Sequence, residues 1–196
     1  MSIKETITEA GNSIKVVTGD LKVVESKSAD GIFINTSGIG FLDEKINISP
    51  QKIKAGDAII INGNIADHGI AILSRREGFN FKSDITSDCA PLNLLVEDIL
   101  AVSKNISALR DATRGGIARV LLELSEISNL SFEIFQDHIP IRKETKSICD
   151  FLGMDPLYIA NEGKMLIIAS DKDKYKILKS LKQNKFGKDA KIIGYV

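Results

Sequence analysis

The sequence contains no tryptophan, and only 6% of its 196 residues are aromatic. Proteins that bind single-stranded nucleic acid stack the bases on aromatic side chains, so this composition argues against such a surface. Lysine and arginine total 26, and so do aspartate and glutamate. The balance excludes a broad basic surface for nucleic acid or for an anionic membrane. We therefore expect neither nucleic acid nor a membrane among the partners.

Cysteine is scarce as well. Cys89 and Cys149 lie far apart in the sequence, which matches neither a disulfide framework nor the spacing of zinc ligands. The first residues lack the signal-peptide pattern, and no apolar run is long enough to cross a membrane. We interpret both cysteines as reduced thiols and expect a cytoplasmic protein.

The chain has the length and composition of one globular domain or two small ones, since 43% of its residues are hydrophobic. The beginning predicts a short helix at 2–11 and then mostly strand, in the segments 14–17, 21–25 and 30–42. These strands are too few to enclose a core and need partners. A turn-rich connector at 47–57 follows, so we expect two domains, 1–48 and 49–196.

From Gly56 onward, apolar strands alternate with amphipathic helices, the pattern of an α/β (α+β) domain. The run 58–63 is continuously apolar, as parallel or central strands tend to be. Further strands are predicted at 131–135, 165–169 and 190–196. Helices are predicted at 70–76, 92–104, 142–152 and 171–183, with one more beginning near Ile117.

A loop that runs into this last helix carries the sequence Asp111-Ala112-Thr113-Arg114-Gly115-Gly116. Free N–H groups and the positive end of a helix dipole suit an anion, and Arg114 adds a forked donor. Gly115 and Gly116 would let a ligand approach the backbone closely. The alternative is an ordinary helix start, in which Asp111 or Thr113 is the N-cap and the glycines form a tight turn. On the helix itself, one apolar face is predicted from Ile117, Val120, Leu121, Leu124 and Ile127.

Asp20 and Lys22 flank the start of a predicted strand. Asp20 would suit a magnesium ion and Lys22 a phosphate, because residues two apart lie on the same side of a strand. The alternative, which the spacing alone favours, is an exposed turn charge and a solvated lysine.

Three further polar positions lie near predicted helix starts or turns. His68 would serve as an acid–base group or phosphate donor, or else as a cap or packed residue. Cys89 would be a nucleophile beside a helix start, but we favour a small buried residue. Glu162, in the turn 161–164, would place a carboxylate at a cleft or belong to a hairpin-like turn. We interpret His138 as structural.

Six motifs in register resemble the HypE family of hydrogenase maturation proteins. They are Val17-Thr18-Gly19-Asp20-Leu21-Lys22-Val23-Val24-Glu25, Asp30-Gly31-Ile32-Phe33-Ile34-Asn35-Thr36, Gly63-x-x-x-Asp67-His68-Gly69, Ser87-Asp88-Cys89-Ala90-Pro91-Leu92-Asn93, Arg110-Asp111-Ala112-Thr113-Arg114-Gly115-Gly116 and Asp155-Pro156-Leu157-Tyr158-x-Ala160-Asn161-Glu162-Gly163-Lys164. Each is weak alone, but together they cover nearly the whole chain in order. The wider superfamily includes aminoimidazole ribonucleotide synthetase, selenophosphate synthetase and thiamine monophosphate kinase.

The resemblance implies an ATP-dependent carbamoyl dehydratase. HypE dehydrates a carbamoyl group on its own C-terminal cysteine to a thiocyanate, and the cyanide reaches the iron of [NiFe]-hydrogenase through the HypC–HypD complex. HypF supplies the carbamoyl group. The implied fold has two domains: an N-terminal ATP-binding sheet domain, whose sheets pair across a homodimer, and a C-terminal α/β domain of the aminoimidazole ribonucleotide synthetase type.

The resemblance also assigns roles to residues of this chain. Asp20 would bind Mg and, with Lys22, belong to the nucleotide site. The loop 111–116 and the turn 161–164 would line the same cleft from the C-terminal domain. The residues expected in the chemistry are Lys22, His68 and Glu162. The residues expected to bind ATP are Asp20, Lys22, Asp111, Thr113, Arg114, Gly115, Gly116, Asn161 and Glu162.

The chain departs from the family pattern at both ends. It begins partway through the N-terminal domain, and it stops at Val196, before the tail with the terminal cysteine. Leu21 replaces a usual threonine and Ala112 a usual proline. We therefore expect the chain alone to lack dehydration activity and to bind ATP weakly. The alternatives are a non-catalytic module that docks HypC–HypD or HypF, and another ATP-using synthetase of the superfamily.

Overall fold

The computed structural model describes residues 15–28, 31–41, 43–76 and 85–196. The chain divides into two units, Met1–Ile46 and Asn47–Val196. The helix predicted at 2–11 lies outside the described residues.

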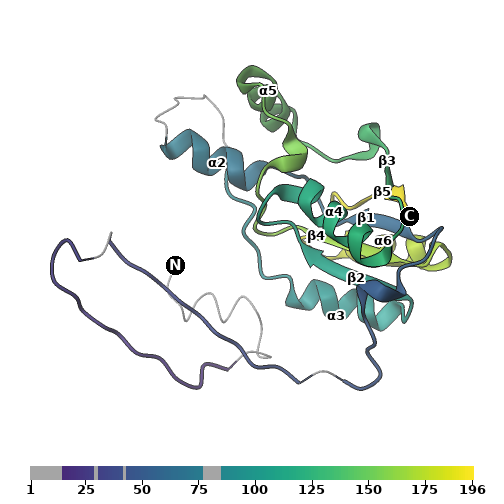
Figure 1. The fold of residues 1–196 in the computed structure, drawn as a ribbon, viewed down its shortest axis with the longest axis horizontal. Helices are drawn as coiled ribbons and strands as arrows, with labels where there is room; N and C mark the ends of the chain where they lie inside the picture. The colour runs from purple at the N-terminus through teal and green to yellow at the C-terminus, as the bar shows by residue number, and fades with distance from the viewer. Residues whose placement is uncertain (1–14, 29–30, 42, 77–84) are drawn as a thin grey trace. The chain divides into compact units, whose positions relative to one another are not determined.

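The described part of the second unit is built on a five-stranded sheet (Figure 1). Its strands are β1 (Ala58–Ile61), β2 (Ile106–Asp111), β3 (Glu133–Ile134), β4 (Met165–Ala169) and β5 (Lys191–Tyr195). The order is β2-β4-β1-β5-β3, and every neighbouring pair is antiparallel. The continuously apolar β1 is thus a central strand, not a parallel one. The α+β class that the sequence predicts is confirmed.

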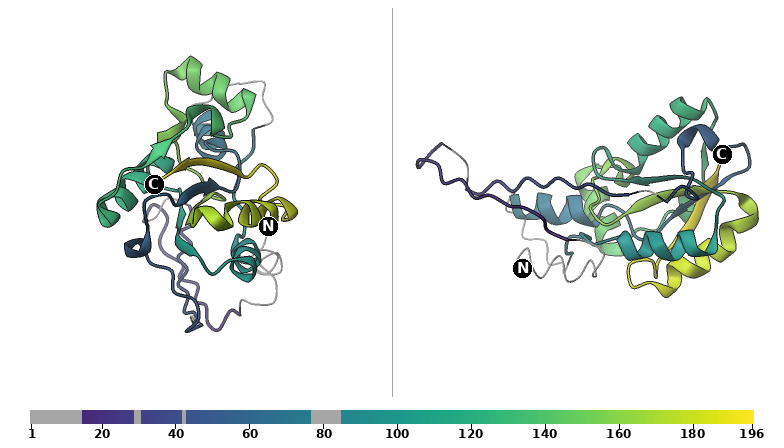
Figure 2. Two further views of the ribbon diagram at one scale, coloured as in Figure 1. Left: turned by 90° about the vertical axis from the view of Figure 1, so that its right-hand side faces the viewer. Right: turned by 90° about the horizontal axis from the view of Figure 1, so that it is seen from below.

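Helices lie on both faces of the sheet (Figure 2). The helices, with the short 3-10 turns labelled η, are η1 (Pro50–Lys52), α2 (Asp67–Arg76), α3 (Asn93–Val102), α4 (Gly116–Ser128), η2 (Gln136–His138), α5 (Lys143–Leu152), η3 (Pro156–Tyr158), η4 (Asp171–Asp173) and α6 (Lys174–Gln183). In the described residues, no helix is long and apolar enough to cross a membrane.

Alternate residues of the central strands face two separate apolar cores. Ile59 and Ile61 of β1 pack with α2, α4 and α5, whereas Ile60 packs with α3 and α6. The same alternation on β4 sends Leu166 and Ile168 to the first core and Ile167 to the second. Because successive side chains of a strand point to opposite faces, an uninterrupted apolar run is what a sheet covered on both sides requires.

Most predicted elements of the second unit are present, with shifted ends. Helix α2 begins at Asp67, three residues before the predicted start. On α4, Ile117, Val120 and Leu124 are buried and Leu121 is partly buried, but Ile127 is exposed, contrary to the predicted apolar face. Ile127 lies in the last turn, beyond the part of the helix that covers the sheet.

The sequence patterns do not predict strand β2 (Ile106–Asp111), and its last residue, Asp111, falls in the predicted loop. The segment contains Ser107 and Arg110 and has no clean alternation of apolar residues. Its pairing with β4 nevertheless supplies a partner for its backbone, with a register shift between Ile106 and Ala108. Long-range pairing therefore decides a strand that local composition conceals.

The strands predicted at 14–17, 21–25 and 30–42 are wrong for the residues that the structure describes there. Residues 15–28 and 31–41 form no ladder and are drawn without arrows in Figure 1. A strand exists through hydrogen bonds to a neighbouring strand, and none pairs with these described segments. Their apolar side chains are exposed, among them Val17, Ile32, Phe33, Ile39 and Phe41.

The central position of β4 gives a test of the double-sided core. Replacing Ile167, which is fully buried, by alanine removes apolar contacts and leaves a cavity, so Ile167→Ala should lower the free energy of unfolding by about 2–5 kcal/mol. The control is Leu122→Ala on the exposed face of α4, with an expected change within about 0.5 kcal/mol. Urea denaturation measures both, and equal losses would contradict this description of the core.

Candidate functional site

Three connecting segments meet at one end of the sheet. Strands β1 and β2 both run antiparallel to β4, so their C-terminal ends lie at the end of the sheet where β4 begins. The segments are 62–68 after β1, 111–116 after β2 and 161–164 before β4. The predicted adjacency of the loop 111–116 and the turn 161–164 is present: the Ala112 N–H donates to the Lys164 carbonyl oxygen at 3.2 Å.

The side chain of Asn161 joins these segments from inside. It is fully buried, and its Oδ1 accepts from the Ala66 N–H at 2.8 Å. Its Nδ2 donates to the carbonyl oxygens of Ala112 and Ile159, both at 3.0 Å. Both amide protons and the oxygen are therefore engaged by the protein itself. Asn161, expected to bind nucleotide, holds the loops in place instead of presenting its amide to a ligand.

The start of α4 contains the tight turn predicted as the alternative, since Arg114 and Gly115 lie in a turn and both glycines have positive φ, but the predicted N-cap is wrong. The N-cap is Gly115, in the left-handed region with φ +72°, and not Asp111 or Thr113. A Cβ on Gly116, whose φ is +63°, would lie 2.3 Å from the Leu157 carbonyl oxygen and 2.7 Å from that of Ile159. The side of Gly116 that lacks a side chain therefore faces η3. Glycine at this position allows the chain to pack closely on itself and does not serve the approach of a ligand.

Of the three arginines around the start of α4, Arg114 has no polar partner among the residues that the structure describes. Arg110 and Arg119 both donate to the Glu123 carboxylate, at 2.8 and 3.0 Å. These hydrogen bonds lower the pKa of Glu123, and the one from Arg119 has the larger effect. The exposed Arg114 makes no hydrogen bond or ion pair to a residue that the structure describes. Arg114 therefore keeps its five donors available for an anion at the start of α4.

Asp111 and Thr113 bond each other: the Thr113 hydroxyl donates to Asp111 Oδ2 at 2.9 Å. Asp111 is the last residue of β2 and is exposed. Both side chains are on the surface beside Arg114, where a ligand would meet them.

His68, in the first turn of α2, faces two other segments through its two ring nitrogens. Nδ1 is 2.8 Å from the Ser87 Oγ, and Nε2 is 3.9 Å from the Glu162 Oε1. The ring is about one-fifth exposed and the Glu162 side chain about two-fifths, 21% and 41%. Two of the three residues expected in the chemistry, His68 and Glu162, thus form a solvent-accessible imidazole–carboxylate pair. The alternative of a merely packed histidine does not describe this geometry.

Beside this pair lies a nearly buried carboxylate that sequence reasoning did not include in the site. Asp88 Oδ1 accepts from the Glu162 N–H at 3.1 Å, and Oδ2 is 3.2 Å from the Lys164 Nζ. The side chains of Asp88 and Lys164 are only 5% and 11% exposed. The sequence shows the motif that contains Asp88, but it does not show that Asp88 contacts Glu162, 74 residues away.

Asp67, another buried aspartate near the site, is the first residue of α2. Thr145 donates to Asp67 Oδ1 at 2.6 Å, and the Arg142 Nε is 3.1 Å from Oδ2. Burial raises the pKa of the Asp67 carboxyl, while the bond from Thr145 and the charge of Arg142 oppose the rise. Asp67 therefore fastens the start of α2 to α5 and is not open to a ligand.

The two cysteines have opposite environments. Cys89 is exposed, contrary to our preference for a small buried residue, because its loop lies at the surface. Cys149 is buried in α5, and burial raises the pKa of its thiol. His138, interpreted as structural, has its ring against Phe135, 5.3 Å between centroids.

The remaining two expected site residues, Asp20 and Lys22, belong to the first unit. Both are exposed, and Asp20 Oδ1 accepts from the N–H of Leu21 at 2.8 Å. The described residues contain no group of three or more His, Cys, Asp or Glu side chains that would hold a metal ion. Asp20 can therefore offer one ligand, not a complete site.

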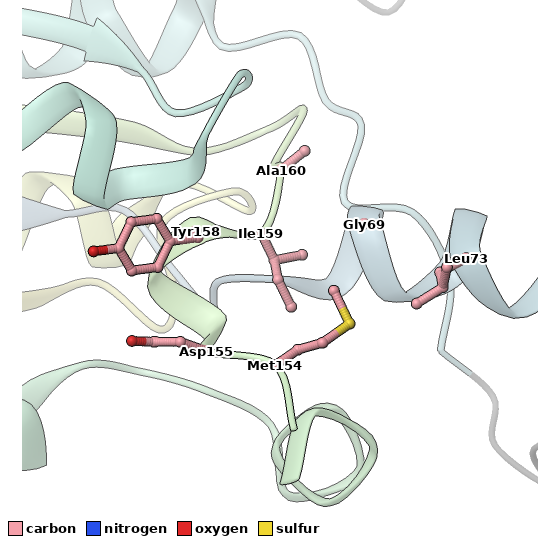
Figure 3. A pocket seen from close by; sticks show the side chains of 7 residues that line it. All are labelled: Gly69, Leu73, Met154, Asp155, Tyr158, Ile159 and Ala160. Carbon is pink, nitrogen blue, oxygen red and sulfur yellow. The ribbon is translucent and has the colours of Figure 1, made fainter. Parts of the chain in front are cut away.

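A hollow of about 360 Å³ lies between α2 and the segment 154–160 (Figure 3). Its lining is mostly apolar: Gly69 and Leu73 come from α2, and Met154 and Ile159 point toward that helix. The carboxylate of its one acidic residue, Asp155, accepts from the N–H of Leu157 and caps η3. This lining lacks the acid–base groups found around His68, so the polar cluster, not the hollow, is the candidate site.

Comparison with known proteins supplies the family. Residues 54–196 match the C-terminal domain of AIR synthase related proteins. The chain belongs to this family. It is 48% identical over 194 residues to a putative hydrogenase expression/formation protein of Methanocaldococcus jannaschii, covering 99% of this chain and 57% of that protein. It is 42% identical over 195 residues to the carbamoyl dehydratase HypE of Azotobacter vinelandii, covering 100% and 57%. The chain thus spans little more than half the length of these relatives.

Solved structures agree with this result. The crystal structure of E. coli HypE is similar with a TM-score of 0.92 at 38% identity, over 97% of this chain and 58% of that chain. HypE in complex with ATP gives 0.73 at 40% identity, over 76% and 44%. HypE in the HypE–HypF complex gives 0.74 at 42%, over 76% and 49%. The resemblance to HypE that the six motifs indicate is confirmed.

The close approach at α4 can be tested by adding one methyl group. Gly116→Ala should be strongly destabilising, because the new Cβ meets backbone oxygens of η3. The matched control is Gly153→Ala, where φ is +66° but no atom lies within 4 Å of the new Cβ. The control should cost about 1–2 kcal/mol from the left-handed conformation, and Gly116→Ala about 1–3 kcal/mol more from overlap. Similar losses in thermal or urea unfolding would refute the packing role of Gly116.

Proposed function

We propose that this chain supplies the C-terminal domain and part of the ATP-binding domain of a carbamoyl dehydratase for [NiFe]-hydrogenase maturation. The observation that carries the proposal is the accessible pair of His68 Nε2 and Glu162 Oε1, at the same end of the sheet as Arg114 and the start of α4. Relatives named carbamoyl dehydratase HypE support the reaction class.

The proposed reaction needs a base. A cysteine thiocarbamate, –S–C(=O)–NH₂, becomes a thiocyanate, –S–C≡N, when its nitrogen loses two protons and its carbon loses the oxygen. ATP becomes ADP and phosphate, and the phosphate retains the carbamoyl oxygen, so no free water is produced. Glu162 is placed to accept a proton from nitrogen, and the neighbouring His68 would orient the Glu162 carboxylate as the catalytic partner of this base. Lys22 is the third residue that we propose for the chemistry.

The fit of the nucleotide rests on the chain's own groups. Arg114 has its guanidinium unengaged among the described residues, and the first N–H groups of α4 lack intrahelical partners, as at every helix start. Both suit phosphate oxygens. Together with Asp111, Thr113 and Gly115, these groups would form the nucleotide wall of the site. Gly116 and Asn161 would hold this wall in shape. The structure of HypE in complex with ATP supports ATP as the co-substrate.

Magnesium would accompany the nucleotide. Asp20 is the proposed ligand, and one carboxylate suffices when phosphate oxygens and water complete an octahedral shell. When bound, the ion would neutralise phosphate charge.

Three partners follow from the same proposal. A HypF-like carbamoyltransferase would deliver the carbamoyl group, and the solved HypE–HypF complex supports this assignment. A HypC–HypD-like complex would receive the cyanide. A second copy of the chain would cover the exposed apolar side chains of the first unit.

Transplanting the domain tests the reaction. Residues 47–196 would replace the corresponding domain of E. coli HypE, leaving that protein's remaining segments in place. After HypF-dependent carbamoylation, mass spectrometry should detect ATP-dependent loss of the mass of one water from the modified cysteine. Glu162→Gln should slow this loss by roughly 10²–10⁴-fold, whereas Glu126→Gln, exposed on α4, should leave it unchanged. A folded chimera that keeps its carbamoyl group with ATP present would refute the proposed function.

The dimer is tested on the chain itself by light scattering. The exposed apolar side chains of the first unit indicate an interface, because monomers rarely expose many such side chains together. We therefore expect light scattering to give twice the mass of one chain. Phe33→Asp, at an exposed position of the first unit, should shift the population toward monomer. Leu122→Asp, exposed on α4, is the matched control and should remain dimeric. A monomer across the whole concentration range would exclude the dimer.

A further inference from the structure

One short loop contacts both members of the His68–Glu162 pair. Ser87 contacts the imidazole, and Asp88 contacts the backbone of Glu162. We propose that Ser87 and Asp88 are positioning residues, which fix the tautomer of His68 and the place of Glu162; the benefit to catalysis rests on the proposed function.

Ser87 sets a direction for the hydrogen bonds around His68. Its Oγ accepts from the Cys89 N–H at 3.2 Å, which leaves the hydroxyl proton available for His68 Nδ1 at 2.8 Å. With Nδ1 as acceptor, a neutral ring carries its proton on Nε2, the nitrogen that faces the Glu162 carboxylate. The hydrogen bonds from Cys89 through Ser87 to the ring thus leave the Nε2–H on the side of Glu162, 3.9 Å from its Oε1.

Asp88 holds the turn that presents Glu162. One oxygen accepts from the Glu162 N–H, and the other lies beside the Lys164 ammonium, so a single carboxylate bridges both sides of Gly163. The contact is tight, because a Cβ on Gly163 would lie 1.9 Å from the Asp88 carbonyl oxygen. Lys164 also donates to the Gly163 carbonyl oxygen at 3.2 Å. Glu162 is therefore fixed at its backbone while its side chain stays accessible.

The burial of this ion pair makes it sensitive to charge. Asp88 Oδ2 lies next to Lys164 at 3.2 Å but accepts no hydrogen bond of good geometry from a described residue. The attraction is therefore largely that of two charges with little water between them. Loss of the carboxylate would leave the Lys164 ammonium buried without its counter-charge.

The first experiment measures the His68 tautomer directly. The chain has two histidines, His68 and His138, so ring ¹⁵N shifts from long-range ¹H–¹⁵N spectra of the full 196-residue chain are assignable with His138→Gln. At alkaline pH, where imidazole is neutral, His68 should show the pattern of an Nε2–H ring. Ser87→Ala should shift both ring nitrogens toward the averaged values of mixed tautomers. The control, Ser147→Ala on exposed α5, should change nothing.

Backbone hydrogen exchange tests Asp88 on the same chain. In Asp88→Ala, the Glu162 amide loses its acceptor and should exchange at least about tenfold faster, the equivalent of roughly 1.4 kcal/mol. Asp88→Asn keeps a side-chain oxygen as acceptor, so the backbone amide of Glu162 should stay protected from exchange. Lys164 nevertheless loses its counter-charge in this variant. This second variant keeps the test decisive where Asp88→Ala destabilises the chain. Unchanged exchange in a folded Asp88→Ala protein overturns the role of Asp88, and an unchanged tautomer in Ser87→Ala overturns that of Ser87.

The activity readout separates positioning from the reaction itself. In the HypE chimera, Ser87→Ala and Asp88→Ala should lower kcat about tenfold or more with the KM for ATP unchanged, because neither residue contacts the nucleotide wall. A wild-type chimera without activity would refute the proposed function, while the ring shifts and amide exchange still decide the positioning. An active chimera whose kcat is unaffected by either change would refute the catalytic benefit.

Discussion

The buried amide of Asn161 holds the end of the sheet together. Its oxygen accepts from Ala66, and its nitrogen donates to Ala112 and Ile159, so three segments that follow or precede different strands share one side chain. Asn62 acts similarly one step away: it accepts from the Met165 N–H and donates to the carbonyl oxygens of Gly163 and Phe186. Buried loops require such partners because unpaired backbone groups are costly away from water. The site is therefore built on satisfied backbone, not on flexible loop ends.

This arrangement divides the polar residues into two kinds. Asn161, Asn62 and Asp67 have their polar atoms engaged inside the protein, and they determine where the loops lie. His68, Glu162 and Arg114 retain exposed polar groups at the same end of the sheet. This separation explains how the same end of the sheet can have its loops held in place and still present polar side chains to a ligand. It also supports the assignment of proton transfer to the exposed pair rather than to the buried carboxylates.

Much of the second unit follows from local sequence, because its signals are strong. The run 58–63 predicts a buried strand, and the periodicity after Gly116 predicts α4, as found. Strand β2 escapes prediction because its partner, β4, lies more than fifty residues away, and its own composition is mixed. The first unit shows the opposite error. Its β-like composition indicates strands, but composition cannot provide the neighbouring backbone that a ladder requires.

By itself, the sequence determined the α+β class, the resemblance to HypE and the residues worth considering, since these depend on periodicity and on motifs read along the chain. The Asp111–Gly116 motif also indicated a helix start correctly. The tertiary structure decided what each residue does: it buried Asn161, turned the open side of Gly116 toward η3, left Arg114 unpaired among the described residues, and brought Ser87 and Asp88 to the His68–Glu162 pair. These outcomes depend on contacts between residues up to 95 positions apart, and local propensity carries no information about such contacts.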